Sequence, residues 1–133
     1  MQRIVAHFQD GRVIKGFTAD FLRAKSQFHM TGQEPSAGTA PTEVRVPDLK
    51  ALFYVKSFEG DPKHQRSNDP SQAGAGRRLR VVFKDGEVMV GTTQGYDRSR
   101  PGFFVVPVDT AGNNERCFVV AGATQEVAFL QAP

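Results

Sequence analysis

The sequence predicts an all-β protein built from two copies of one five-stranded unit. Three observations support this prediction: an internal repeat, an Asp-Gly turn signal in each copy, and a composition rich in turn and β-forming residues. The 133 residues include 11 Phe, 13 Gly and 8 Pro but no Trp, a mixture that favours short strands and tight turns over long helices. This length suffices for one ordinary domain or two very small ones.

The repeat joins Arg3–Phe21 to Arg78–Tyr96, and the two segments align from end to end without a gap. Seven of the 19 aligned positions are identical: Arg3/Arg78, Phe8/Phe83, Asp10/Asp85, Gly11/Gly86, Val13/Val88, Gly16/Gly91 and Thr18/Thr93. Chance can match one Asp-Gly pair, but it rarely matches a whole F-x-D-G-x-V-x-x-G-x-T frame. The duplication therefore predicts that the two halves fold alike.

Each copy opens with a predicted hairpin, whose turn is Asp10-Gly11 in the first copy and Asp85-Gly86 in the second. Asp-Gly between alternating apolar residues is typical of a two-residue type I′ turn. The cross-strand pairs predicted from such a loop are Phe8 with Val13 and Phe83 with Val88, both pointing inward.

The remaining elements follow from short apolar segments and breakers. Gly16 and Gly91 fall inside the second strand of each hairpin, where glycine permits a sharp bend or bulge. The further strands are expected at 27–30, 43–46 and 51–58 in the first copy, and at 102–108, 116–120 and 125–130 in the second. Polar or small residues at 47–50 and 121–124 predict a single 3₁₀ turn before each last strand.

This pattern resembles the SH3-like or Sm-like small β-barrel, present twice. The frame D-G-x-x-x-x-G-x-x-x-x-[FY], which ends at Phe21 and at Tyr96, is similar to the first Sm motif. The chain also resembles an uncharacterised bacterial domain family in the segments DLKALFYVKSFEGD, which closes one repeat, and FKDGEVMVG, which opens the next. This second resemblance gives no activity to carry over. The first resemblance implies barrels at 1–60 and 76–133, joined by a linker at 61–75. Because several strands are apolar on both faces, we expect the two barrels to pack as one pseudo-symmetric unit.

Two polar segments carry no apolar periodicity. Glu59–Gly76, EGDPKHQRSNDPSQAGAG, has the composition of a flexible linker or loop. Thr31–Thr42 is predicted to be an insertion in the first copy, because only Asp109–Glu115 separates the corresponding strands of the second. We expect an inert loop there, with an acquired partner site as the alternative.

Composition and charge exclude several classes. No apolar run approaches the roughly 18–20 residues of a membrane helix, and the first residues lack the apolar stretch of a signal peptide, so no membrane insertion is expected. The single cysteine, Cys117, excludes an intramolecular disulfide and favours a reducing compartment, here the cytoplasm. A net charge of +3 permits an anionic partner without requiring one.

We expect neither catalysis nor a metal or other cofactor. Cys117 lies in the apolar segment RCFVVAG, where a small buried thiol is the ordinary role. The sequence contains no G-x-S-x-G, H-E-x-x-H or P-loop motif, and its acidic residues are scattered. His7, His29 and His64 are dispersed and lack the close spacing of metal ligands.

The leading hypothesis is a non-enzymatic protein-binding adaptor or regulatory module in a bacterial signalling complex. Strands such as Phe103-Phe104-Val105-Val106 are apolar on both faces, and an exposed apolar patch usually marks an interface. We expect the two copies to cover much of this surface on each other, with a partner protein on other strands. The predicted partner contacts are Phe103, Phe104, Arg98 and Arg100, in a monomer or homodimer.

The first alternative is single-stranded RNA binding, which the Sm-like resemblance implies. Its predicted contacts are Arg77, Arg78, Arg80 and Tyr96. Sm proteins keep an Asn five places after the motif aromatic, but this chain has Ser26 and Pro101 there. The Arg-Gly of the second Sm motif is also replaced in both copies, so nucleic acid is disfavoured.

The second alternative is cyclic-dinucleotide sensing. The segments 69–74 (DPSQAG) and 97–102 (DRSRPG) resemble the [DN]-x-S-x-x-G element of PilZ domains. The preceding Arg-x-x-x-Arg element, whose two guanidinium groups would grip the ligand, is missing from the sequence. Asp, Ser, Pro and Gly are also common in any turn.

Overall fold

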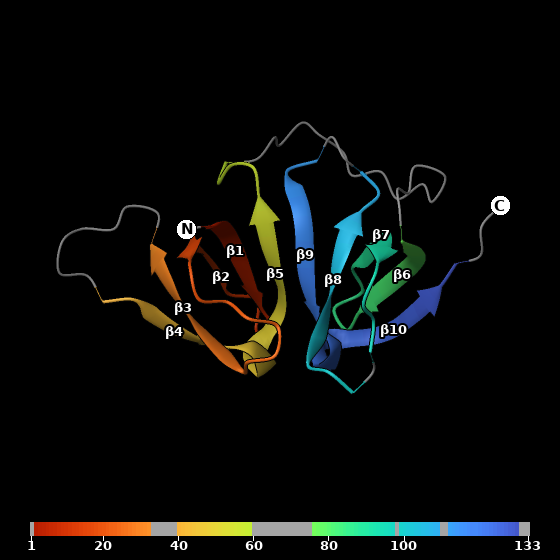
Figure 1. Ribbon diagram of the computed structural model, residues 1–133, viewed down its shortest axis with the longest axis horizontal. Coiled ribbons are helices and arrows are strands. Elements are labelled where there is room, and N and C mark those ends of the chain that lie inside the picture. The colour runs from red at the N-terminus through yellow and green to blue at the C-terminus, as the bar shows by residue number, and fades with distance from the viewer. Residues whose placement is uncertain (1, 33–39, 60–75, 98, 110–111, 131–133) are drawn as a thin grey trace.

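The computed structural model describes residues 2–32, 40–59, 76–97, 99–109 and 112–130, and it is all-β (Figure 1). The strands are β1 (Gln2–Phe8), β2 (Val13–Thr18), β3 (Gln27–Gly32), β4 (Thr42–Arg45), β5 (Leu49–Val55), β6 (Arg77–Phe83), β7 (Val88–Thr93), β8 (Gly102–Pro107), β9 (Asn114–Val120) and β10 (Thr124–Phe129). The predicted 3₁₀ turns are confirmed as η1 (Val46–Asp48) and η3 (Ala121–Ala123). No helix long and apolar enough to cross a membrane occurs in these ranges.

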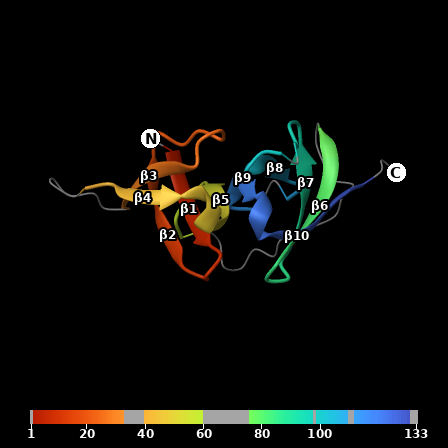
Figure 2. The same cartoon turned by 90° about the horizontal axis from the view of Figure 1, so that it is seen from below.

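All ten strands form one antiparallel sheet in the order β10-β6-β7-β8-β9-β5-β1-β2-β3-β4. Each half therefore has the same internal order, with its fifth strand beside its first and its fourth strand at the other end. The halves join where β5 pairs with β9, and Figures 1 and 2 show them curling away on either side of this junction. The sheet is not closed, and β4 and β10 are its outer strands. The predicted linker at 61–75 lies outside the described residues.

The alignment of the repeat holds through both halves. The same constant offset relates the starts of β3 and β8 (residues 27 and 102), of η1 and η3 (46 and 121), and of β5 and β10 (49 and 124). The copies are thus equal in length between these points, and the predicted insertion at Thr31–Thr42 is wrong. The connection between the third and fourth strands is shorter in the second copy, because β9 begins at Asn114. This start lies earlier in its copy than the start of β4, Thr42, lies in the first. Asn114 already pairs with Val55 of β5, so a second neighbouring strand extends β9.

The Asp-Gly turns differ from the predicted type I′ geometry. The Gly11 N–H donates to the Phe8 carbonyl (3.1 Å), and the Phe8 N–H donates to the Arg12 carbonyl (2.9 Å). Gly11 has a φ of +95°, whereas no non-glycine residue among those described has a positive φ. This is a four-residue turn with a glycine bulge, so Asp10 avoids the left-handed region that a type I′ turn would impose on it.

The bulge shifts the predicted register by one residue in both hairpins. His7 pairs with Val13, and Val82 pairs with Val88. Phe8 is buried as predicted, but Val13 is 48% exposed, because adding one residue to the loop moves the following strand's side chains to the other face. Phe83 and Val88 show the same split, at 0% and 37% exposure.

Gly16 and Gly91 are required by the close approach of the next strand. A Cβ atom on Gly16 would lie 2.0 Å from the Thr31 carbonyl oxygen, and one on Gly91 would lie 2.4 Å from the Val106 oxygen. At these positions β2 and β7 first pair with β3 and β8. The glycines therefore allow each hairpin to continue into its third strand.

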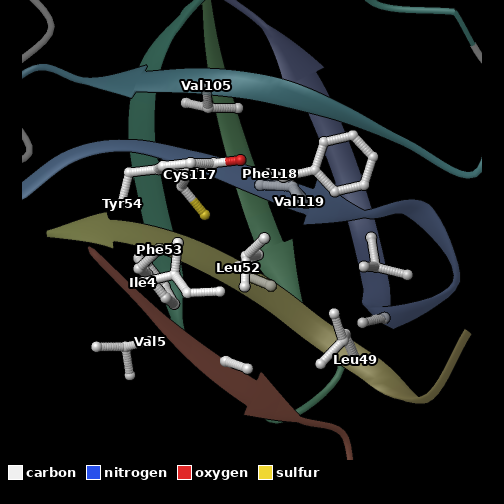
Figure 3. Close-up of a cluster of buried hydrophobic side chains, with 14 of the residues drawn as sticks. Ile4, Val5, Leu49, Leu52, Phe53, Tyr54, Val105, Cys117, Phe118 and Val119 are labelled. Atoms are coloured by element: carbon white, nitrogen blue, oxygen red, sulfur yellow. The ribbon is translucent and has the colours of Figure 1, made fainter. Parts of the chain in front are cut away.

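The β5·β9 junction is buried on both faces (Figure 3). Leu52 pairs with Phe118, and both side chains are 0% exposed; on the opposite face Phe53 (4%) pairs with Cys117 (0%). Leu52 lies on the face of Ile4 and Ala6, which is the inside of the first half, whereas Cys117 lies on the inside of the second half with Val105. The inner face of one half thus continues as the outer face of the other.

A partly buried lysine adds an ionic link across the halves. Lys50 Nζ lies 2.7 Å from Asp85 Oδ2 and 2.5 Å from Glu87 Oε1, with its side chain 13% exposed. Burial lowers the pKa of Lys50, but hydrogen bonds to the two carboxylates outweigh this effect, so the net pKa is raised. The hydrogen bond from Lys50 is the main cause of the lowered pKa of Asp85.

Replacing Gly16 should test the strand-approach argument. We expect Gly16→Ala to lower the free energy of unfolding by about 2–4 kcal/mol, because the new methyl group would overlap backbone that cannot move aside cheaply. Gly32→Ala is the matched control, since a Cβ atom there meets nothing within 4 Å. Urea unfolding followed by circular dichroism measures both, and equal losses would contradict the argument.

Lys50→Met should lower the free energy of unfolding by about 1 kcal/mol at neutral pH, because it removes the ammonium group that bonds Asp85 and Glu87. Asp85 has a folded pKa below its ordinary 3.8, so its contribution is present above that pH and disappears as the pH falls through the folded value. Lys50 has a folded pKa above 10.5, so its contribution persists up to that pH. The stability difference from wild type should be flat at neutral pH and shrink in acid. Lys25→Met, in an exposed loop, should change little at any pH.

Candidate functional site

A groove of about 490 Å³ lies where the two halves meet. We call it the junction groove. It is lined by Arg23 from the β2–β3 loop of the first half and by Thr92, Thr93, Gln94, Gly95, Phe104, Val106 and Arg116 from the second. Thr92 pairs with Val106 across β7 and β8, so the floor of the groove is the outer face of the second half of the sheet.

Arg116 is held over two aromatic rings. The centre of its guanidinium lies 4.3 Å from the ring centroid of Tyr54 and 4.8 Å from that of Phe104. Cation–π contacts of this kind fix the plane of the guanidinium. Burial raises the pKa of the Tyr54 hydroxyl, and the charge of Arg116 partly opposes that rise.

Arg23 reaches the groove from the first half. It lies in an exposed turn, and its Nη1 atom is 3.5 Å from the position a Cβ atom would take on Gly95. Within the described ranges, neither Arg23 nor Arg116 has a carboxylate within ion-pair distance. Two arginines, one from each half and neither paired with a carboxylate of the described residues, therefore face the same groove.

Phe21 fixes the loop that carries Arg23. Its ring makes edge-to-face contacts with Phe28 of its own half (5.0 Å between centroids) and with Phe118 of the other half (5.0 Å). Phe104 lies 6.2 Å away, also nearly perpendicular. The counterpart of Phe21 in the second half, Tyr96, packs within its own half instead. The aromatic cluster beneath the groove is thus specific to the junction.

The predicted partner contacts are separated by the structure. Phe104 is half-buried and lines the groove, whereas Phe103 is 3% exposed and packs against Tyr96 (4.9 Å between centroids). Phe103 therefore contributes to the core and presents no surface to a partner. Arg100 lies outside the groove, with Nε 3.7 Å from Asp97 Oδ2, and Arg98 lies outside the described residues.

The predicted RNA contacts do not form one surface. Because side chains alternate along β6, Arg78 and Arg80 point to the outer face and Arg77 to the inner one. Arg77 stacks over Phe129 at 3.8 Å, and Arg80 Nη2 lies 3.7 Å from Glu126 Oε1. The ring of Tyr96 makes edge-to-face contacts with the rings of Phe103 and Phe129.

The PilZ-like element at 97–102 forms a local turn. Asp97 Oδ1 accepts hydrogen bonds from the Ser99 backbone N–H (2.9 Å) and hydroxyl (2.7 Å). These bonds, the backbone one first, lower the pKa of Asp97. The hydrogen-bonding groups of Asp97 and Ser99 are thus used within the turn itself. Arg98 and the similar segment at 69–74 lie outside the described residues.

The histidines and the cysteine occupy separate places. His29 Nδ1 lies 2.8 Å from Asp20 Oδ2, and the His29 backbone N–H is the main cause of the lowered pKa of Asp20. His7 packs edge-on against Phe53, and His64 lies outside the described residues. Among the residues described, no group of three or more His, Cys, Asp or Glu side chains could hold a metal ion.

Sequence reasoning missed Arg23 and Arg116. Arg116 had a usable signal, since it is a cation at the start of the apolar run CFVV in a predicted strand. Arg23 had none, because a lone arginine in a polar loop is ordinary.

Together these features define a duplicated all-β protein with a cationic groove at the junction of its copies. Residues 1–131 match the family described as "Family of unknown function (DUF6982)". The chain belongs to this family, which agrees with the predicted resemblance to an uncharacterised domain. No curated protein and no solved structure matches the chain.

Cys117 offers a probe of the junction, because its buried thiol lies opposite Phe53 on β5. We expect a thiol reagent such as DTNB to modify Cys117 only as fast as the protein opens, orders of magnitude more slowly than a free thiol. Phe53→Ala should accelerate modification by opening a cavity beside it. Phe129→Ala, at the far end of the sheet, is the control. Rapid labelling of the native wild type would contradict the junction as described.

Proposed function

We propose that this chain is a non-enzymatic binding module that recognises another protein through the junction groove. In this proposal each half is an SH3-like or Sm-like unit, with bounds of 1–60 and 76–133, and the protein works as an adaptor in the cytoplasm. The observation that carries the proposal is the pair of arginines, one from each copy, that face one groove without a carboxylate partner among the described residues.

The groove has the composition of a protein-binding site. Arginine and aromatic residues are enriched where interfaces gain most of their affinity. Arg116 and Phe104 supply both, and they stand on paired strands rather than on a loop. A ligand would therefore meet side chains that are already ordered, which reduces the entropy lost on binding.

RNA binding remains the alternative, and the contacts of the aromatic rings favour it less. Single strands bind by stacking bases on free aromatic faces. Arg116 covers Phe104, Arg77 covers Phe129, and Tyr96 contacts two other rings. The rings near the arginines are engaged within the protein.

Affinity capture with a matched pair of variants tests the proposal. The tagged full chain is compared with Arg23→Gln/Arg116→Gln, which removes the groove charges, and with Arg77→Gln/Arg80→Gln, which removes the same charge from β6. We expect the wild type and the β6 variant to retain the same proteins from native lysate, quantified by mass spectrometry. The groove variant should lose at least about 90% of them, a tenfold change.

The thermal unfolding of all three proteins shows whether they fold equally well. Capture that is unchanged in the groove variant would contradict the proposed site. Loss of captured material in the β6 variant alone, with release by ribonuclease, would favour the RNA alternative.

A further inference from the structure

We infer that the junction groove selects an acidic peptide segment, with Arg23 and Arg116 binding its carboxylate side chains. This inference rests on the proposed function and adds the chemistry of the partner. It follows from the charge, the geometry and the size of the groove.

The positive charge of the groove is not neutralised by nearby acids of the described chain. Glu115 neighbours Arg116 in sequence, but alternation along β9 sends its side chain to the opposite face. Asp97 is bonded to Ser99 and lies near Arg100. Asp20, on the same loop as Arg23, is bonded to His29. The acids closest in sequence thus lie on the opposite face or are bonded elsewhere, and an acidic ligand would supply a countercharge.

The geometry of Arg116 suits a carboxylate. Its contacts with Tyr54 and Phe104 place the guanidinium over the faces of those rings. Within the described ranges its N–H groups have no carboxylate within ion-pair distance. A planar guanidinium can bind both oxygens of a carboxylate at once. Because the rings already hold its orientation, little side-chain freedom is lost when a ligand binds.

The size of the groove fits a short segment of chain. Its volume of about 490 Å³ lies in the range of roughly 300–1,000 Å³ that is typical of ligand sites. Val106 on the floor of the groove is 48% exposed, and the polar residues Thr92 and Gln94 line the groove with it. We therefore expect an apolar residue next to the acidic ones in the preferred peptide.

A display library of random peptides, each about a dozen residues long, tests this inference with the full chain as bait. We expect the wild type to enrich Asp and Glu several-fold over the input library and the Arg23→Gln/Arg116→Gln variant to lose this enrichment. The Arg77→Gln/Arg80→Gln variant should keep it. Enriched peptides without acidic residues, or equal enrichment on all three proteins, would overturn the inference.

Binding measurements with one enriched peptide then separate charge from geometry. By fluorescence anisotropy, its Asp→Asn and Glu→Gln version should bind at least about tenfold more weakly. Arg116→Lys keeps the charge but not the planar fork, and we expect it to bind weakly as well. Arg23→Gln, in an exposed turn, provides a groove variant that does not disturb the core. A labelled oligouridine of the same length that binds more tightly, and depends on the same arginines, would overturn the inference in favour of RNA.

The two proposals fail differently. If captured proteins depend on Arg23 and Arg116 but acidic peptides are not enriched, the partner chemistry is wrong and the binding site stands. If acidic peptides bind through these arginines but no captured protein does, the proposed adaptor role is wrong.

Discussion

Backbone pairing between β5 and β9 is the interaction on which the rest of the structure depends. It joins the last strand of one copy to the fourth strand of the other, so the two repeats become one sheet. Each half has only about 55 residues, a size at which a single core is marginal. The junction removes two strand edges from water and buries side chains on both faces of both strands.

The junction also explains how the copies have diverged. With the two copies aligned as before, apolar residues of β5 and β9 correspond to polar or smaller ones in the outer strands: Leu49/Thr124, Ala51/Glu126 and Phe53/Ala128, and Cys117/Thr42, Phe118/Glu43 and Val120/Arg45.

The two outer strands of the sheet, β4 and β10, are different edges of the same repeat. Pairing between such edges can in principle continue from one molecule to the next. Here the two remaining edges carry charges, and Pro41 precedes β4. Such residues discourage further strand pairing.

The element positions were predictable because they depend on local patterns. The repeat frame located the hairpins, Gly16 and Gly91, and the 3₁₀ turns. The register of the hairpins could not be predicted, since Asp-Gly occurs both in a two-residue turn and in a turn with a glycine bulge. The strand pairings that follow these two turns differ by one residue. The insertion assigned to Thr31–Thr42 failed because strand lengths depend on neighbours: β9 is long because β5 lies beside it. Phe103 was wrongly assigned to the surface, because the sequence of a strand that is apolar on both faces does not show which face is covered by the rest of the chain.

The meeting of Arg23 and Arg116 in one groove could not have been predicted, because it is a product of the same junction. When sheets join edge to edge and curl in opposite senses, the inside of one half continues as the outside of the other. Phe104 and Phe118 lie on the outer face of the second half, so Phe21 from the first half can pack against them. That contact brings the Arg23 loop beside Arg116. Two copies that packed face to face would have buried Arg116 or left Arg23 distant from it. The edge-to-edge arrangement keeps both arginines at the surface of one groove, which neither copy could form alone.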